Sequence, residues 1–437
     1  MTVKIAIIGS GPSGMYAMDG ANKYMPECQV DIIDRLPTPY GLIRAGVAPD
    51  HLGTKNVIHQ YEKAIAKGDV KYFGNIEIGK DISINNLREL YDAVIIATGA
   101  AQDRKLAIPG EELKGVYGSA EFVGWYNGHP DYANLAPDMS GKSAIIIGNG
   151  NVSLDIARLM AKTPAERRDT DLPEGAADIF DKSNFSDVHV VGRRGPLQTS
   201  FTPPELRELG RLDNAIPVID DRLLSDTAQL DIDDTTAHGR IIKKDQDIFH
   251  SFTELKADNA KTKVHLQFLA SPVEIIGKDH VTSVKFEKNI LKGGRAVGTG
   301  AYFEIDADIV ITAIGYKSRP IPGIAYDDKK GFFPNVDGHI SDNIYVVGWG
   351  KRGPSGTIPV NRPDSFAVAK LIAEKVKPTD KAGRQGLNKI FVGNTIKTTN
   401  FDDWKILDQI EIKRAIPPKA REKIVTIDEM LELISST

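Results

Sequence analysis

The chain has 437 residues, too many for one ordinary hydrophobic core, so we expect two or three domains. Its net charge of −4 gives no overall case for nucleic-acid binding. No apolar run has the length of a membrane span, and the first predicted strand already begins at Val3, so we expect a cytoplasmic protein without a leader. Cys28 is the only cysteine, which excludes an intrachain disulfide, a cysteine-pair redox site and a cysteine-ligated cluster within this chain. Redox chemistry would therefore require a bound cofactor.

The first motif follows a near-continuous apolar run, residues 3–8, which is typical of a buried parallel strand. Residues 9–14 read GSGPSG, the G-x-G-x-x-G pattern of a strand-to-helix turn, and we expect a helix over residues 15–23. Gly9 permits the tight turn, Gly11 lets a pyrophosphate approach the backbone, and Gly14 lets helix and strand pack closely.

The next predicted strand, residues 30–33, ends in Asp34, twenty residues after Gly14. A carboxylate at this distance can accept a hydrogen bond from a ribose hydroxyl. Glycine turns also serve simple packing, but a strand before, a helix after and this acid together favour dinucleotide binding.

Residues 35–51 contain three prolines and two glycines and predict a long loop at the sheet edge where the dinucleotide should lie. A helix is expected over residues 56–67 and strand structure over 70–78. The buried strand predicted at 91–99 has an approximate copy at 307–315.

A second dinucleotide motif begins at Ser143, because a predicted strand over 144–147 is followed by GNGNVS and a helix from Leu154. The chain therefore carries an internal duplication. After a polar insertion at 163–186, the next strand ends not in an acid but in Arg193 and Arg194. Guanidinium groups there suit a ribose 2′-phosphate; the alternative is a solvated surface pair.

The later segments are less informative. The charge-dense stretch 231–247 predicts surface loops, and alternating residues within 264–303 predict an antiparallel appendage. Residues 343–358 run from a strand into a glycine-rich turn, and a short helix is expected at 427–434.

Several blocks, in order, resemble one family: 37–42, 46–51, 122–127, 148–152, 192–196 and 347–349. The chain resembles ferredoxin–NADP reductases of the adrenodoxin-reductase type. The resemblance implies an α/β fold with two Rossmann-like dinucleotide-binding domains. The FAD domain would comprise both chain ends, residues 1–104 and 324–437, and the NADP domain residues 105–323.

The resemblance also implies cofactor-binding residues. Besides Gly9, Gly11 and Gly14, the FAD positions are Ser13, Asp34, Leu42, Ile78, Trp349, Gly356, Thr357 and Ile358. The NADP positions are Arg104, Asn149, Gly150, Asn151, Val152, Arg193, Arg194, Glu205 and Gly356. Asp34 stands where the family usually has Glu, and prolines beside Glu205 and Ile358 depart from its pattern.

The implied activity is hydride transfer from NADPH to FAD, followed by single-electron transfer to a ferredoxin-type iron–sulfur protein, or the reverse. His51 and Glu208 fall where the family places a proton-handling pair near the flavin, although His51 could merely fix its loop. No metal ligands are assigned. The alternatives are another FAD- and NADPH-dependent oxidoreductase acting on an organic substrate, or a module that binds NADP without turnover.

An acidic ferredoxin would require a local basic surface on a chain that is acidic overall. Arg207 and Arg211 follow Glu205, and Lys243 and Lys244 lie in the charged stretch downstream. The resemblance places this region near the partner's docking site, where opposite charges would chiefly raise the association rate. The alternative is that these are ordinary solvated side chains. Neither a membrane nor a nucleic-acid partner is expected.

Overall fold

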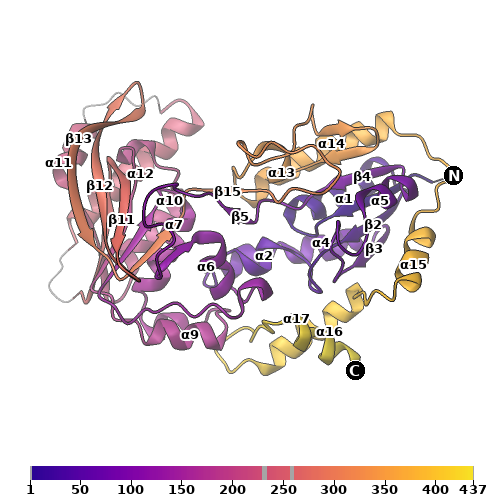
Figure 1. Cartoon of the computed structure of the whole chain (residues 1–437), viewed down its shortest axis with the longest axis horizontal. Coiled ribbons are helices and arrows are strands. Elements are labelled where there is room, and N and C mark those ends of the chain that lie inside the picture. The colour runs from indigo at the N-terminus through magenta and orange to yellow at the C-terminus, as the bar shows by residue number, and fades with distance from the viewer. Residues whose placement is uncertain (1, 229–233, 256–259, 437) are drawn as a thin grey trace. The chain divides into compact units, whose positions relative to one another are not determined.

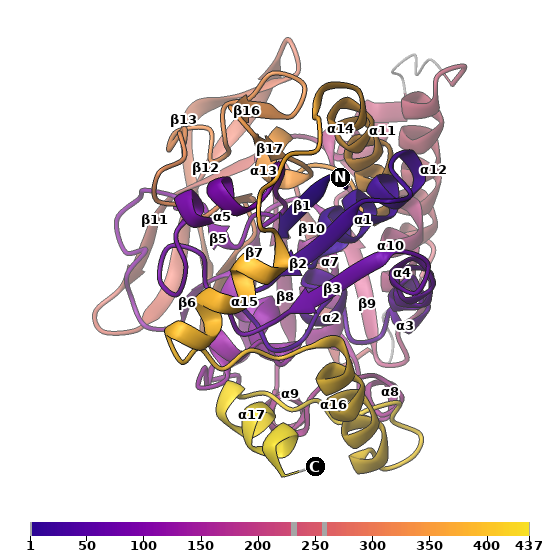
Figure 2. The same cartoon turned by 90° about the vertical axis from the view of Figure 1, so that its right-hand side faces the viewer.

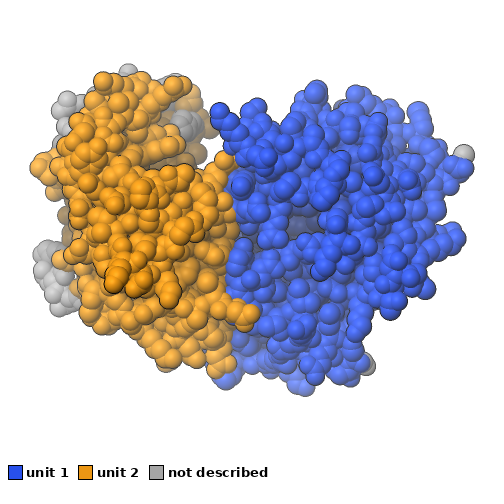
Figure 3. Space-filling view, in the orientation of Figure 1, with its two compact units in different colours: residues 1–102, 127–133, 315–437 blue, residues 103–126, 134–314 orange. Residues whose placement is uncertain are grey.

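The computed structural model describes residues 2–228, 234–255 and 260–436, and it divides into two compact units (Figures 1 and 3). Unit 1 comprises residues 1–102, 127–133 and 315–437, and unit 2 comprises residues 103–126 and 134–314. Compared with the expected boundaries, residues 127–133 and 315–323 group with unit 1 and residues 103–104 with unit 2. Asp131 is held in unit 1 by two hydrogen bonds of 2.8 Å from Arg35.

Unit 1 is built on a six-stranded sheet in the order β16-β17-β4-β1-β2-β3, parallel except for β16. Figure 2 shows β1, β2 and β3 side by side. The strands are β1 (Lys4–Ile8), β2 (Gln29–Ile33), β3 (Asp69–Phe73), β4 (Ala93–Ile96), β16 (His339–Ser341) and β17 (Ile344–Val346). The short strands β5 (Gln102–Asp103) and β15 (Tyr316–Lys317) lie at sequence boundaries of the units.

The helices of unit 1 cover both faces of this sheet. Alternate residues of β1 point to opposite sides of the sheet, and helices bury them on each side. Ile5 and Ile7 pack in a cluster with residues of α1, α14 and α16, whereas Ala6 and Ile8 pack with residues of α5 and α15. The helices are α1 (Pro12–Tyr24), α2 (Leu42–Ala45), α3 (Leu52–Lys55), α4 (Ile58–Ile65), α5 (Ile84–Leu90), η1 (Pro130–Tyr132), α13 (Trp349–Arg352), η4 (Ile358–Val360), α14 (Asn361–Lys375), α15 (Arg384–Gly393), α16 (Phe401–Arg414) and α17 (Ile427–Ser435).

Unit 2 repeats this plan with a six-stranded parallel sheet in the order β6-β14-β7-β8-β10-β9. The strands are β6 (Val116–Gly118), β7 (Ser143–Ile147), β8 (Asp187–Val191), β9 (Ala215–Ile219), β10 (Thr262–Gln267) and β14 (Ile309–Thr312). In unit 1 the strand before the first glycine motif, β1, lies between β2 and β4. In unit 2 the strand before the second motif, β7, lies between β8 and β14. This reversal of strand order is where open α/β sheets bind ligands.

One face of this sheet packs, through residues of β14, β7 and β8, against an antiparallel sheet of β11 (Ala270–Gly277), β12 (Val281–Lys292) and β13 (Arg295–Asp306). The prediction of an antiparallel appendage is thereby confirmed, except that β10 belongs to the parallel sheet. The helices of unit 2 are α6 (Ser119–Tyr126), α7 (Asn151–Ala161), α8 (Pro164–Arg167), α9 (Glu174–Asp181), η2 (Pro196–Gln198), α10 (Pro203–Glu208), η3 (Leu209–Arg211), α11 (Asp221–Ala228) and α12 (Ala237–Thr253).

The prediction of surface loops over 231–247 is wrong for residues 237–247. Residues 231–233 lie outside the described residues and residues 234–236 form a turn, but α12 runs through the rest of the stretch from Ala237. Ile248, Phe249 and Phe252 bury one side of this helix, so its charged residues other than the buried Asp245 lie on the outer face of an amphipathic helix. No helix in the described ranges is both long and apolar enough to cross a membrane.

Candidate dinucleotide-binding sites

The turn after β1 requires glycine at two positions. Gly9 has φ +105°, and a Cβ there would lie 2.5 Å from the Ala97 carbonyl oxygen. A Cβ on Gly14 would lie 2.0 Å from the Gly9 carbonyl oxygen. At Gly11 the nearest atom would be 4.0 Å away, so this position leaves room for an approaching ligand. Helix α1 starts there with no side-chain cap, which leaves the N–H groups of its first turn available to a pyrophosphate.

The loop over residues 35–51 crosses this turn. Tyr40 and Gly41 both have positive φ, and a Cβ on Gly41 would come within 3.0 Å of Gly11 Cα. The Tyr40 N–H donates to the Ser10 carbonyl oxygen at 3.2 Å. The loop then enters the short helix α2 at Leu42, which is exposed. The proline-rich segment is thus anchored on the glycine turn.

Asp34, at the end of β2, faces the same turn. Its Oδ2 accepts hydrogen bonds from the Ser10 N–H at 2.7 Å and the Ser10 hydroxyl at 2.5 Å, and its Oδ1 accepts from the Leu36 N–H at 3.0 Å. A carboxylate offers about four acceptor positions, so one remains for a ribose hydroxyl. These bonds hold the carboxylate at the carboxyl edge of the sheet.

The C-terminal part of unit 1 reaches the first motif through α14. The Ser13 hydroxyl donates to Asn361 Oδ1 at 3.1 Å, and the Ser365 hydroxyl donates to the Ser13 carbonyl oxygen at 2.9 Å. Gly348 has φ +65°, and a Cβ there would lie 1.9 Å from Ser13 Oγ. The Gly348 N–H donates to Asp364 at 2.6 Å. The sequence analysis missed Asn361, Asp364 and Ser365, because no local pattern pairs them with a motif more than 300 residues away.

The remaining predicted FAD residues lie in unit 1. The Trp349 indole N–H donates to the Ser355 carbonyl oxygen at 3.1 Å, and the Trp349 ring centroid lies 6.2 Å from that of Tyr316. Gly356 has φ +80°, Thr357 is exposed, and Ile358 opens η4. Ile78 is half-buried against the core cluster of α5 and α15.

The second motif is built in the same way. Gly148 has φ +143°, and a Cβ there would lie 2.2 Å from the Ala313 carbonyl oxygen, whereas a Cβ on Gly150 would meet nothing within 4 Å. Helix α7 begins at Asn151, again without a side-chain cap. The Asn149 side chain packs on the backbone of Gly192, where a Cβ would lie 1.7 Å from its amide nitrogen. The turn is closely packed at its first glycine and open at its second.

A segment after β8 braces the start of α7. The Asn151 amide donates to the Thr202 hydroxyl at 3.2 Å and accepts from the Thr202 N–H at 2.9 Å, while the Ser200 N–H donates to the Asn149 carbonyl oxygen at 2.9 Å. Asn149 Oδ1 and Ser153 Oγ are buried and have no hydrogen-bond partner among the described residues. Buried unpaired polar atoms are uncommon, so a ligand that supplies partners fits this turn. The sequence contained no signal for Thr202 or Ser200.

Arg193 and Arg194 follow β8 and are both exposed. Their backbone is fixed, because Asn289 Nδ2 donates to the Arg193 carbonyl oxygen at 2.9 Å and the Leu269 N–H donates to that of Arg194 at 3.1 Å. Within residues 2–228, 234–255 and 260–436, neither guanidinium forms an ion pair. Both are therefore available to an anionic ligand.

The two predicted proton-handling residues stand in different units. His51 precedes α3 in unit 1, and Glu208 ends α10 in unit 2. Glu208 Oε2 lies 3.0 Å from a guanidinium nitrogen of the buried Arg158, which also lies 2.8 Å from Asp155. Glu208 is thus part of an ion cluster inside unit 2, and its pairing with His51 stays a prediction.

Three further predicted NADP residues also lie in unit 2. Glu205 is half-buried in α10, and its Oε2 has no hydrogen-bond partner in the described part of the chain. Arg104 is half-buried, and Val152 belongs to the first turn of α7. Glu205 therefore offers a buried acceptor that a ligand could satisfy.

Of the four predicted docking cations, Arg207, Arg211 and Lys244 are exposed and form no ion pair with any described residue, whereas exposed Lys243 pairs with Asp234 at 2.9 Å. Buried Asp245 lies beneath this region, and burial raises its pKa to about 7 against the opposing effect of Arg207. Lys243 therefore contributes less positive charge to this surface than the other three.

The chain is similar to known proteins over nearly its whole length. Residues 3–209 match the family model described as pyridine nucleotide-disulphide oxidoreductase. The mitochondrial NADPH:adrenodoxin oxidoreductase of Arabidopsis thaliana is 38% identical, covering 98% of this chain and 94% of that protein. The NADPH-ferredoxin reductase FprA of Mycobacterium tuberculosis is 37% identical, covering 98% of each chain. A structure of M. tuberculosis FprA in complex with NADPH superposes with a TM-score of 0.93 at 35% identity, covering 100% of both chains.

Proposed function

Because the chain belongs to the family of NADPH:adrenodoxin and NADPH-ferredoxin oxidoreductases, we propose that it passes electrons from NADPH through FAD to a ferredoxin-type iron–sulfur protein, or in the reverse direction. We place FAD in unit 1 and NADP(H) in unit 2. The expected domains, residues 1–104 with 324–437 and residues 105–323, remain our assignment of the two cofactors along the chain.

The uncapped start of α1 supports the FAD assignment, since it can bind a pyrophosphate with backbone N–H groups. Asp34 would accept the ribose hydroxyl with its remaining acceptor position. Ser13, Gly348 and α14 form one hydrogen-bonded frame, which would fix the segment from Trp349 to Ile358 beside the cofactor. Leu42 and Ile78 would supply apolar contact.

The observation that carries the NADP assignment is the pair of exposed arginines at the end of β8. Arg193 and Arg194 stand where the first unit has Asp34, and no carboxylate neutralises them within the described residues. Guanidinium groups bind a phosphate dianion bidentately, whereas an acid would repel it. The unpaired buried atoms of Asn149, Ser153 and Glu205 would gain partners from the nucleotide. Arg104, Gly150 and Val152 complete the proposed site.

A flavin supplies the chemistry that this chain lacks, since it exchanges two electrons with a nicotinamide and one at a time with an iron–sulfur centre. The residues of the chain bind and orient the two nucleotides and exclude water. His51 is proposed to handle the proton that accompanies hydride transfer, and Glu208 to act with it as a carboxylate held by Arg158.

Coenzyme preference tests the NADP assignment. Charge-assisted hydrogen bonds contribute roughly 1.5–3 kcal/mol each, so replacing both Arg193 and Arg194 by alanine should lower the preference for NADPH over NADH by about 10²-fold or more. The measurement is kcat/KM for each coenzyme with ferricyanide as acceptor. Arg168→Ala is a matched control, because this exposed arginine lies beyond α8. A wild-type enzyme that uses NADH as well as NADPH would contradict the assignment.

We propose that the partner docks on the basic surface of Arg207, Arg211, Lys243 and Lys244, with Lys243 the weakest contributor because Asp234 pairs with it. Reversing Arg207 and Arg211 to Glu should slow ferredoxin reduction at low salt and leave ferricyanide reduction nearly unchanged. If both activities fell together, the arginines would serve NADPH binding or folding instead.

The compartment remains a prediction. We propose the cytoplasm, although the plant relative is named as mitochondrial. Subcellular fractionation of the source cells distinguishes the two, and recovery in an organelle fraction would contradict the proposal.

A further inference from the structure

Three potential metal ligands lie on one face of the parallel sheet of unit 2. Asp187 and His189 are two residues apart in β8, so their side chains point to the same side. His265 lies on the neighbouring strand β10, in register with His189. The sequence analysis assigned no metal ligands, and only the parallel pairing of β8 with β10 brings these residues together.

The three side chains are close enough to share an ion. His265 Nε2 lies 2.7 Å from Asp187 Oδ1, and the rings of His189 and His265 stack with centroids 4.5 Å apart and planes inclined by 12°. One ligand atom from each residue lies within 4.8 Å of the other two. Tetrahedral zinc with bonds of about 2.0–2.1 Å separates its ligand atoms by about 3.4 Å. Small side-chain rotations would therefore close the set around one ion.

Two buried polar atoms at this place lack partners. His189 Nδ1 and Gln267 Oε1 are both buried; the two side chains interact with each other, but neither atom makes a hydrogen bond of good geometry among the described residues. Gln267 follows His265 by two residues in β10, so it lies on the same face of the sheet. A buried unpaired imidazole nitrogen costs about 1–3 kcal/mol, and coordination to a cation would remove this cost. Gln267 is placed to hold the orientation of the histidine ligands by a hydrogen bond from outside the coordination shell.

We propose that Asp187, His189 and His265 bind a divalent transition-metal ion of the Zn²⁺ type. Two imidazoles and one carboxylate match the ligand preference of zinc and its neighbours, whereas Ca²⁺ and Mg²⁺ prefer sites made of oxygen atoms. Three protein ligands leave one coordination position for water or a small ligand. The ion would join β8 to β10 across their hydrogen-bonded edge.

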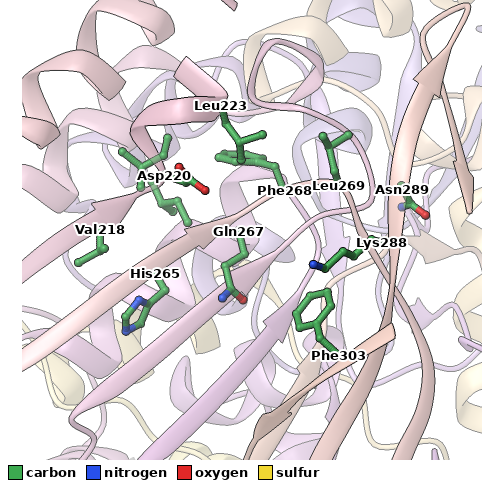
Figure 4. A pocket seen from close by; sticks show the side chains of 12 residues that line it. Val218, Asp220, Leu223, His265, Gln267, Phe268, Leu269, Lys288, Asn289 and Phe303 are labelled. Atoms are coloured by element: carbon green, nitrogen blue, oxygen red, sulfur yellow. The ribbon is translucent and has the colours of Figure 1, made fainter. Parts of the chain in front are cut away.

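This site is separate from the proposed nucleotide site. Asp187 opens β8, whereas Arg193 lies six residues further along, beyond the other end of this strand, and six residue steps of extended chain span about 20 Å. His265 and Gln267 instead line a cavity of about 480 Å³ together with Val218, Lys288 and Phe303 (Figure 4). The cavity gives solvent and ions a route to His265. The inference therefore does not depend on the proposed electron transfer.

The test is zinc titration of the chelator-treated holoenzyme by isothermal calorimetry, with the melting temperature measured alongside. The wild type should bind one Zn²⁺ per chain and melt at a higher temperature with zinc, because an ion that binds only the folded state stabilises it. His189→Asn and Asp187→Asn should each lose this binding event and the shift in melting temperature. His250→Asn, which changes an exposed histidine of the same unit, should retain both.

Gln267→Ala should weaken zinc binding by about 10–100-fold without abolishing it, as loss of an orienting partner does. Cobalt substitution should give the intense visible absorption of tetrahedral Co²⁺ in the wild type but not in Asp187→Asn. Because Asp187 is 40% exposed at its side chain, this variant is expected to fold normally, which its melting temperature without zinc checks. Equal zinc affinity in the wild type and in either ligand variant would overturn the proposal, as would no binding by the wild type.

Discussion

Replacing Glu411 by glutamine tests a buried ion network that fixes the loop over the first glycine turn. The Glu411 side chain is fully buried and accepts two hydrogen bonds from Arg44 in α2, one of them at 2.8 Å. It also accepts a hydrogen bond from Arg421 at 3.1 Å and one from the Ile424 N–H at 3.0 Å. Glutamine keeps the shape but removes the charge that neutralises two guanidinium groups. Arg44 is only 9% exposed at its side chain.

Breaking a buried ion pair costs about 3–5 kcal/mol, because the remaining charge stays desolvated. We expect Glu411→Gln to lower the free energy of unfolding of unit 1 by about 3 kcal/mol and to weaken flavin retention, since Arg44 lies in α2 beside Leu42. The assay is urea unfolding followed by tryptophan fluorescence and by flavin release. The matched control is Glu429→Gln, whose ion pair with Arg414 is about 40% exposed on both sides and should cost below about 1 kcal/mol.

The effect should also depend on pH. The neighbouring guanidinium groups, with the Ile424 N–H, hold the pKa of Glu411 below its usual range against the raising effect of burial. A lowered pKa contributes stability above the unfolded-state pKa, about 4.3, and this contribution is lost as the pH falls through the folded-state pKa. The difference between wild type and Glu411→Gln should therefore be constant near neutral pH and shrink below about pH 4.3. Equal destabilisation by Glu411→Gln and Glu429→Gln would refute the reasoning.

Three further predictions concern single side chains. Burial raises the pKa of Asp245 to about 7, so the free energy of unfolding should fall as the pH rises from about 4 to 7. Asp245→Asn should therefore have a free energy of unfolding roughly 1–3 kcal/mol higher than wild type at pH 8 but not at pH 4. The same pH dependence of stability in both proteins would contradict this. Gly14→Ala should lower the melting temperature and lose flavin, because its Cβ would lie 2.0 Å from a backbone oxygen. Gly11→Ala should keep the wild-type melting temperature and lose only flavin, and equal melting temperatures for the two variants would exclude this distinction. Burial raises the pKa of Cys28 to about 11, so its thiol should react with a thiol reagent only after denaturation, and rapid labelling of the native protein would disprove the buried position.

Both glycine turns could be predicted from sequence because their determinants are local. Gly9 and Gly148 adopt positive φ between a buried strand and a helix, and the apolar run before each motif forms a buried parallel strand. The position of Asp34 followed from the same spacing. These features depend on residues close together in the chain.

The features that could not be predicted depend on distant pairing or on hidden periodicity. Charged residues in α12 suggested loops, although Phe249 and Phe252 give the helix a buried side that also covers Asp245. The hydrogen bond between Ser13 and Asn361 joins residues 348 positions apart, and no alternation or spacing in the sequence predicts it. His189 meets His265 only because β10 pairs with β8.

The central claim is that electrons pass from NADPH through bound FAD to an iron–sulfur protein. An anaerobic stopped-flow experiment tests it most directly, with flavin-loaded enzyme mixed first with NADPH and then with a [2Fe–2S] ferredoxin. The account predicts that NADPH bleaches the flavin absorbance, that NADH does so much more slowly, and that the ferredoxin is then reduced as the flavin absorbance returns. A flavin that stays oxidised with NADPH, or a reduced flavin that leaves every ferredoxin tested oxidised, would contradict it.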